Sequence, residues 1–142
     1  MAITISPCKA EPELSDPTVT GIFAPKMAII SAQVHHPPWC GYIGRSDGVP
    51  AGYGGFKAPP SETGDVEIAY LTFPKFERQG VATGIAAELV EIAKRENLLA
   101  VCAHTLPEEN ASTAVLRRNG FVRDGDAHDP GEGTVWRWRL DL

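Results

Sequence analysis

The feature that most constrains the fold of this chain is a change in its hydrophobic period around Pro74. The run Val66–Phe73 is rich in β-branched and aromatic residues, which favours a strand. Beyond Pro74 the apolar residues recur at helical spacing, at Val81, Ile85, Leu89 and Ile92/Ala93. This spacing predicts an amphipathic helix that packs on a sheet. Because Leu98–His104 is then typical of a buried strand, we expect a right-handed crossover between two parallel strands.

Turn and cap signals predict the remaining elements. The turn Ser46-Asp47-Gly48 separates the apolar-rich runs Trp39–Arg45 and Pro50–Lys57, so these form a hairpin whose meander continues into Val66–Phe73. A second helix is expected over Asn110–Asn119, with Gly120 at its left-handed cap. The pattern further predicts a short strand Ile3–Ile5, a short helix Lys26–Val34 and a closing strand pair, Phe121–Arg123 with Thr134–Leu140, joined by the polar loop Asp124–Gly133.

The order of these elements predicts the α/β class, with a twisted mixed (α+β) sheet and helices on both of its faces. The length of 142 residues indicates a single domain over residues 1–142, because domains cluster at about 100–150 residues. Hydrophobic residues make up 43% of the chain and charged residues 22%, as in ordinary globular proteins.

Charge and cysteine usage exclude several classes of partner. A net charge of −5 argues against a nucleic acid, which requires a basic face, and suits a cationic ligand. The three cysteines are far apart and odd in number, unlike a disulfide framework. No leader pattern and no apolar run of about 18 residues is present, so we expect no membrane partner and a cytoplasmic location. His35 and His36 lack a partner at metal-ligand spacing, so we expect no metal.

The loop before the predicted helix has the character of an anion site. The first turn of a helix has backbone N–H groups without internal partners, and the helix dipole places partial positive charge there. Gly80 has no Cβ, so the backbone can approach a bulky anion closely. A pyrophosphate is a natural ligand for such a loop. Gly80 could equally make a tight turn into an ordinary helix, and the loop alone does not decide between the two.

Several motifs, taken in order, carry a family resemblance. They are Val66-Glu67-Ile68-Ala69-Tyr70, Arg78-Gln79-Gly80-Val81-Ala82-Thr83, Asn110-Ala111-Ser112, Val115-Leu116 and Asn119-Gly120-Phe121. With them the chain resembles the GNAT superfamily of N-acetyltransferases, in the branch that acetylates ribosomal-protein N-termini and its small-molecule relatives. The resemblance covers residues 39–142, whereas residues 1–38 match poorly.

The resemblance implies a function and a set of site residues. It implies direct acetyl transfer from acetyl-CoA, as co-substrate, to a primary amine in a ternary complex without a metal; the acceptor would be a small molecule or a peptide. Tyr70, Leu71 and Thr72 would pair with the pantetheine arm, and a backbone N–H there would stabilise the oxyanion. Asn110 and Ser112 would contact the pantetheine and its thiol end. Backbone amides of the loop would bind the pyrophosphate, at Arg78, Gln79, Gly80, Val81, Ala82 and Thr83.

Two positions depart from the family pattern. Glu77 stands where relatives carry Gln or Arg, and Leu116 stands where many carry the Tyr that protonates the leaving thiolate. Ser112 or water is then the remaining candidate acid. These departures keep open a non-catalytic acyl-CoA-binding or regulatory domain as the alternative, beside a structural domain with no CoA site. A homodimer whose second copy completes the acceptor site is also possible.

An amine acceptor also requires a base, because amines are mostly protonated at neutral pH. Glu67 is the best candidate in the sequence and shares a strand face with Ala69 and Leu71. At about 3.3 Å per residue it lies roughly 13 Å from Leu71, so it would act through a bridging water. A glutamate on a solvated strand face is the alternative. His104 ends a strand near the expected opening of the sheet, where it either lines the acceptor pocket or has a structural role. The sequence does not decide which amine is the acceptor: a protein N-terminus, a polyamine-like molecule and an amino-sugar antibiotic all fit.

Overall fold

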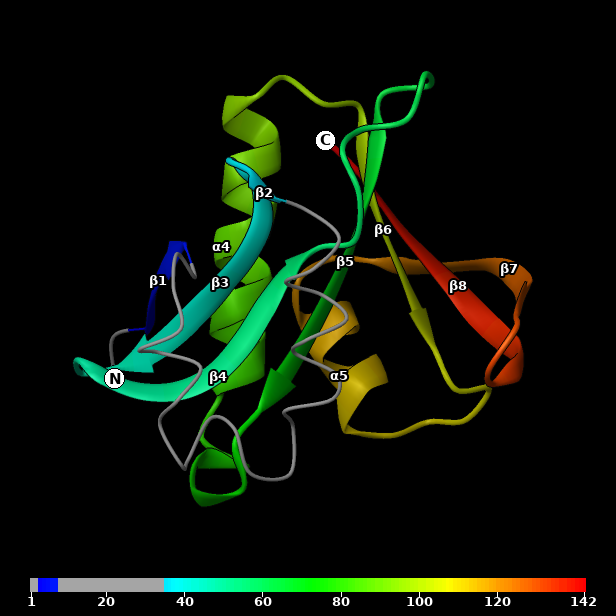
Figure 1. Ribbon diagram of the computed structural model, residues 1–142. Coiled ribbons are helices and arrows are strands. Elements are labelled where there is room, and N and C mark those ends of the chain that lie inside the picture. Colours follow the sequence, from blue (N-terminus) through cyan, green and yellow to red (C-terminus); the bar gives the residue numbers. More distant parts are fainter. Residues whose placement is uncertain (1–2, 8–34) are drawn as a thin grey trace.

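The computed structural model describes residues 3–7 and 35–142 (Figure 1). Its elements are β1 (Ile3–Pro7), β2 (His35–His36), β3 (Trp39–Ser46), β4 (Val49–Phe56), β5 (Asp65–Thr72), the short helix η1 (Pro74–Phe76), α4 (Val81–Arg95), β6 (Ala100–Thr105), α5 (Ala111–Arg118), β7 (Val122–Asp129) and β8 (Gly133–Asp141). The sheet order is β1-β3-β4-β5-β6-β8-β7, with β2 paired to β3. The predicted N-terminal strand is confirmed, whereas the predicted helix Lys26–Val34 lies outside the described residues.

The sheet is mixed, as predicted. The β3, β4 and β5 strands form an antiparallel meander, and β5 pairs in parallel with β6 over the short register Asp65–Glu67 against Ala100–Cys102. The β6, β8 and β7 strands are again antiparallel. The parallel pair across α4 confirms the expected crossover connection.

The prediction of a polar loop over Asp124–Gly133 is wrong for most of its length. The β7 strand continues to Asp129 and pairs with β8, with an irregularity between Arg123 and Asp126. The polar composition of this segment is typical of a loop, but β7 is an edge strand of an antiparallel pair, and such a strand can expose most of its side chains to water.

Helix α4 approaches the meander closely because glycines line its path. A Cβ built on Gly54 would lie 2.5 Å from Ile85 Cγ2, and one built on Gly44 would lie 2.5 Å from Ile85 Cδ1. The glycine-rich segment of β4 therefore serves helix–sheet packing. Buried residues of α4, α5 and the helix-facing sides of β5 and β6 form one cluster. The two α-helices of the described part of the chain thus cover the same face of the sheet, and helices on the other face stay a prediction.

Candidate active site

The site begins where β5 and β6 part. Their parallel pairing ends at Glu67 and Cys102, although both strands continue beyond that point (Figure 1). On its other side β5 stays paired with β4 as far as Thr72. The second half of β5 therefore has one paired edge and one edge that no described strand covers. The two strands therefore splay apart beyond Glu67 and Cys102.

The backbone of β5 alternates between these two edges. Lys57 N–H donates to Glu67 O at 2.9 Å, and Phe73 N–H donates to Ala51 O at 2.9 Å, so the odd-numbered residues of β5 bond to β4. Alternate residues of such a ladder point their N–H and C=O groups the other way. Tyr70 and Thr72 therefore direct theirs toward the open edge, where an extended ligand can add as a strand.

Leu71 lies differently from its two neighbours. Its carbonyl oxygen is the atom nearest to a Cβ built on Gly52, at 2.5 Å, so its backbone faces β4. Of the three residues expected to pair with the pantetheine arm, Tyr70 and Thr72 have their backbone groups at the open edge. Leu71 has only its side chain to contribute.

The loop between η1 and α4 presents exposed backbone in an unusual conformation. Arg78 has a φ of 64° and Gly80 a φ of 79°, both left-handed, and Glu77, Arg78, Gln79 and Gly80 are all exposed. A non-glycine residue in this region is uncommon, and such strain concentrates at functional sites. A Cβ on Gly80 would meet no atom within 4 Å. The glycine is therefore required by its backbone angles and not by crowding.

The N-terminus of α4 suits an anion. Gly80 is its N-cap; no side chain caps the helix, and its first turn contains no acidic residue. Val81 is buried in the core, so only its backbone N–H can contribute, while Ala82 and Thr83 are half-buried. Gln79 Nε2 donates within the loop to Lys75 O at 3.4 Å. The amides of the first turn thus have neither a capping oxygen nor a competing carboxylate, and they can hold a pyrophosphate.

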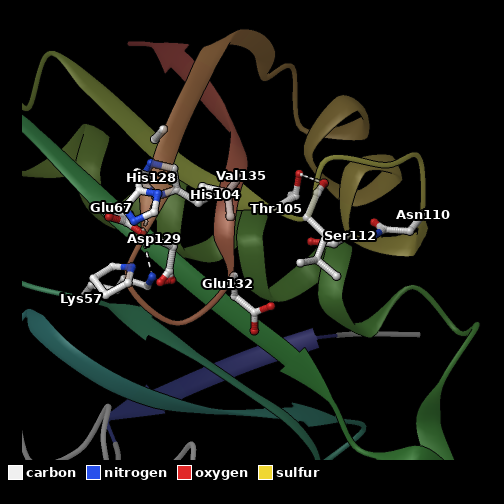
Figure 2. A pocket seen from close by; sticks show the side chains of 13 residues that line it. Lys57, Glu67, His104, Thr105, Asn110, Ser112, His128, Asp129, Glu132 and Val135 are labelled. Atoms are coloured by element: carbon white, nitrogen blue, oxygen red, sulfur yellow. Dashed lines mark hydrogen bonds and ion pairs between the residues drawn. The ribbon is translucent and has the colours of Figure 1, made fainter.

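A pocket of about 610 Å³ opens beside the splayed strands (Figure 2). Its walls come from the residue after β4, the first half of β5, the end of β6, the start of α5 and the β7–β8 hairpin: Lys57, Glu67, His104, Thr105, Leu106, Asn110, Ser112, Ala127, His128, Asp129, Pro130, Glu132 and Val135. In Figure 2, Glu67 and His104 gather at one end and Ser112 at the other. The two residues predicted as base and acid therefore face one cavity from different sides.

Glu67 is the centre of a charged cluster at the first end. Its Oε2 lies 2.9 Å from His104 Nδ1 and 2.8 Å from Lys57 Nζ. The Glu67 and His104 side chains are each 28% exposed, and that of Lys57 is 47% exposed. Glu67 is therefore not a solvated surface glutamate. Of the two roles predicted for His104, the structure agrees with the one in which its side chain lines the pocket.

Ser112, at the other end, is bound to Tyr70. The Tyr70 hydroxyl lies 3.1 Å from both the carbonyl oxygen and the Oγ of Ser112. Burial raises the pKa of Tyr70 to about 12, so its hydroxyl stays protonated at neutral pH. Asn110, which also lines the pocket, is the N-cap of α5, because its Oδ1 accepts from Thr113 N at 3.1 Å. Its amide nitrogen, which the cap does not use, can donate to a ligand.

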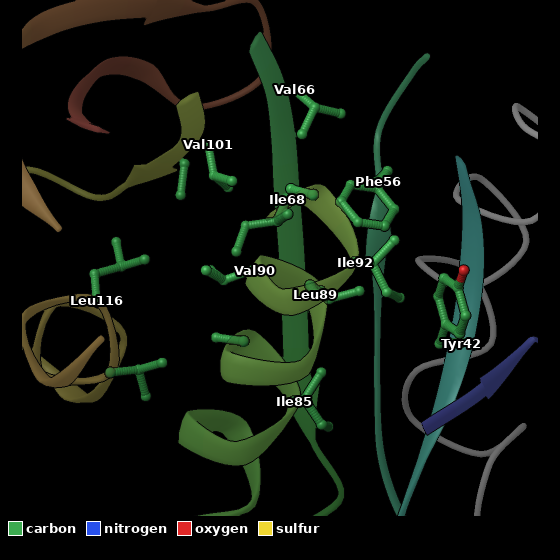
Figure 3. Packing of buried hydrophobic residues seen from close by; sticks show 14 of the residues in the cluster. Tyr42, Phe56, Val66, Ile68, Ile85, Leu89, Val90, Ile92, Val101 and Leu116 are labelled. Atoms are coloured by element: carbon green, nitrogen blue, oxygen red, sulfur yellow. The ribbon is translucent and has the colours of Figure 1, made fainter. Parts of the chain in front are cut away.

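The two departures from the family pattern have different surroundings. Leu116 is fully buried and belongs to the hydrophobic core cluster (Figure 3), so this position of α5 cannot supply an acid. Glu77 is exposed, at the end of η1.

Sequence reasoning missed several lining residues. Lys57 lies directly opposite Glu67 where the β4–β5 ladder continues past Phe56. A prediction of the strand register between these two segments could have found this pair. His128, Asp129 and Glu132 were placed in a loop, so nothing local indicated that they reach the pocket.

Comparison with known families decides what this arrangement is. The family model described as "Acetyltransferase (GNAT) domain" matches residues 13–122. The chain belongs to the GNAT acetyltransferase family. It is accordingly an acetyl-CoA-dependent acetyltransferase, and acetyl-CoA is its co-substrate. A comparison with curated proteins yields no significant match.

Solved GNAT structures share the fold. The aminoglycoside acetyltransferase AAC(6')-Ib in complex with coenzyme A is 14% identical with a TM-score of 0.77, covering 99% of this chain and 95% of its own. The ribosomal L7/L12 α-N-protein acetyltransferase RimL, also with coenzyme A, is 22% identical with a TM-score of 0.64, covering 72% of this chain and 62% of its own. A GNAT acetyltransferase from Bacillus anthracis is 18% identical with a TM-score of 0.62, and the match covers 71% of this chain and 65% of the Bacillus anthracis chain. No described helix is long and apolar enough to cross a membrane.

Proposed function

We propose that this protein transfers the acetyl group of acetyl-CoA to a primary amine of a small, multiply charged cation, by direct attack within a ternary complex. The observation that carries this proposal is the pocket at the splay of β5 and β6, which has the Glu67 cluster at one end and Ser112 at the other. A cytoplasmic location and a homodimer that completes the acceptor site remain part of the same proposal.

The coenzyme half of the site follows from two backbone features. The first-turn amides of α4 would hold the pyrophosphate, and the open edge at Tyr70 and Thr72 would hold the pantetheine arm. When bound, acetyl-CoA supplies an activated thioester. An N–H on that edge would stabilise the negative charge that develops on the thioester oxygen.

The acceptor half is acidic. Glu67, Asp129 and Glu132 line the pocket, against one lysine, Lys57. Carboxylates in a concave site concentrate cations. This lining favours acceptors with several amino groups, such as amino sugars or polyamines, over a single peptide N-terminus. AAC(6')-Ib has been solved with kanamycin, which makes an amino sugar a natural first compound.

A thiol-release assay tests the proposal. Purified protein and acetyl-CoA are incubated with kanamycin, a linear polyamine, a peptide with a free N-terminus or no amine. We expect amine-dependent release of free CoA and an acetylated polycation of matching mass. If the peptide alone is acetylated, the small-molecule acceptor is wrong.

The same samples test the non-catalytic alternative. At a hundred times its dissociation constant, CoA should raise the free energy of unfolding by about 2.7 kcal/mol. For a chain of this size that corresponds to a rise in Tm of very roughly 8 °C. A thermal shift with CoA but no amine-dependent thiol release would favour an acyl-CoA-binding domain. The absence of both would favour a structural domain.

A further inference from the structure

We propose that His104 Nε2, and not the Glu67 carboxylate, accepts the proton from the acceptor amine, while Glu67 and Lys57 act as positioning residues. The inference rests on the proposed acetyl transfer and assigns the roles within its pocket. Glu67 was the base predicted from the sequence, and the structure gives its carboxylate other partners.

The first argument is the hydrogen bond between Glu67 and His104. Glu67 Oε2 lies 2.9 Å from His104 Nδ1, and an ionised carboxylate only accepts hydrogen bonds. The proton of the neutral imidazole is therefore on Nδ1. This tautomer leaves the lone pair on Nε2, where it can take a proton from a ligand. A carboxylate that orients an imidazole through Nδ1 is the arrangement by which histidine serves as a base in serine hydrolases.

The second argument is that the same carboxylate oxygen is already engaged. Lys57 Nζ lies 2.8 Å from Oε2, so this oxygen accepts from two donors, one directly after β4 and one on β6. Protonation of the carboxylate at either oxygen would remove the negative charge that strengthens both of these bonds. The Nε2 atom of His104 has no hydrogen bond or ion pair to another described residue.

The third argument is position. Glu67 pairs with Cys102 at the last rung of the parallel ladder, and His104 is two residues further, on the same face of β6. Its ring thus stands where the strands have parted, in the wall of the pocket (Figure 2). Histidine can accept and release a proton near neutral pH, as a general base must.

The proton and electron balance is simple. The acceptor ammonium loses one proton to His104 Nε2, and the freed nitrogen lone pair attacks the thioester carbon. A C–N bond forms, and the C–S bond breaks with its electron pair on sulfur. The nitrogen loses a second proton, which ends on the CoA sulfur through water or the Ser112 hydroxyl. His104 releases its proton to solvent. The products are the amide, free CoA and one proton.

Matched variants separate the two roles. In His104→Asn the amide nitrogen can replace Nδ1 as donor to Glu67, but no base remains. We expect kcat/KM for the amine at neutral pH to fall by about 10²- to 10⁴-fold. The limb of the pH profile that is set by the imidazole should be lost, which leaves only a rise toward high pH as the amine itself becomes neutral. In Glu67→Gln an acceptor oxygen for His104 Nδ1 remains. We therefore expect kcat/KM to fall only about tenfold and the imidazole limb of the pH profile to be retained.

Each outcome decides the assignment. The proposed division of roles predicts that the imidazole limb is lost in the His104 variant alone. It would be overturned if the limb were lost in the Glu67 variant alone, in both variants or in neither. The CoA-induced rise in Tm, measured for every variant, separates a folding defect from a catalytic one. If the wild-type protein shows no amine-dependent thiol release, the proposed function itself fails, and that result is distinct from an altered pH profile.

Discussion

Replacement of Gly80 by Ala tests the coenzyme loop most directly. Gly80 has a φ of +79°, and its added Cβ would meet no atom within 4 Å. In the free protein the substitution therefore brings only backbone strain, about 1–2 kcal/mol for an L-residue in the left-handed region. In the complex the new methyl group would keep the pyrophosphate away from the first-turn amides. Loss of one hydrogen bond to a charged group costs about 1.5–3 kcal/mol. We therefore expect Kd for CoA to rise by roughly 10- to 150-fold.

Gly48→Ala is the matched control. Gly48 has a φ of +84°, its Cβ would also meet nothing within 4 Å, and it lies in the β3–β4 turn, outside the residues that line the pocket. Chemical denaturation should show similar losses of stability for the two variants. Isothermal titration with CoA should show weakened binding for Gly80→Ala alone. Equal CoA affinities would refute the idea that the amides near Gly80 bind the coenzyme.

Three further predictions concern the acid end, the core and the acceptor wall. Tyr70→Phe should lower kcat several-fold with little change in KM, because the Ser112 hydroxyl on α5 loses its hydrogen-bond partner. Since the pKa of Tyr70 is raised from 10.0 to about 12, its contribution to stability is complete below pH 10 and is lost as pH rises toward 12, so the variant should show a shallower decline in denaturation free energy over that range. Gly54→Ala should cost about 1–3 kcal/mol, because its Cβ would lie 2.5 Å from Ile85 Cγ2; a double-mutant cycle with Ile85→Ala should show strong coupling. Asp129→Asn and Glu132→Gln should each raise KM for a polycationic amine up to about fivefold, less so at high salt, while KM for acetyl-CoA stays constant.

The order of the elements could be predicted, and a candidate coenzyme loop proposed, because their signals are local. Hydrophobic period distinguishes strand from helix within a few residues, and this was enough for β5, α4 and their order. A glycine before a helix, together with family motifs on either side, was enough to predict a pyrophosphate loop there. The same local reasoning was wrong for β7, since an exposed edge strand carries no apolar alternation to distinguish it from a loop.

The sequence by itself determined that a strand, a loop with a glycine and an amphipathic helix follow one another, because backbone hydrogen bonding and side-chain period are encoded over short distances. Only the tertiary structure decided that Lys57, Glu67 and His104 meet on one carboxylate oxygen, and that Tyr70 bonds to Ser112. These contacts depend on the register of three strands and on the point where β5 and β6 part. Register and divergence are set by packing across the whole sheet, which no short stretch of sequence specifies.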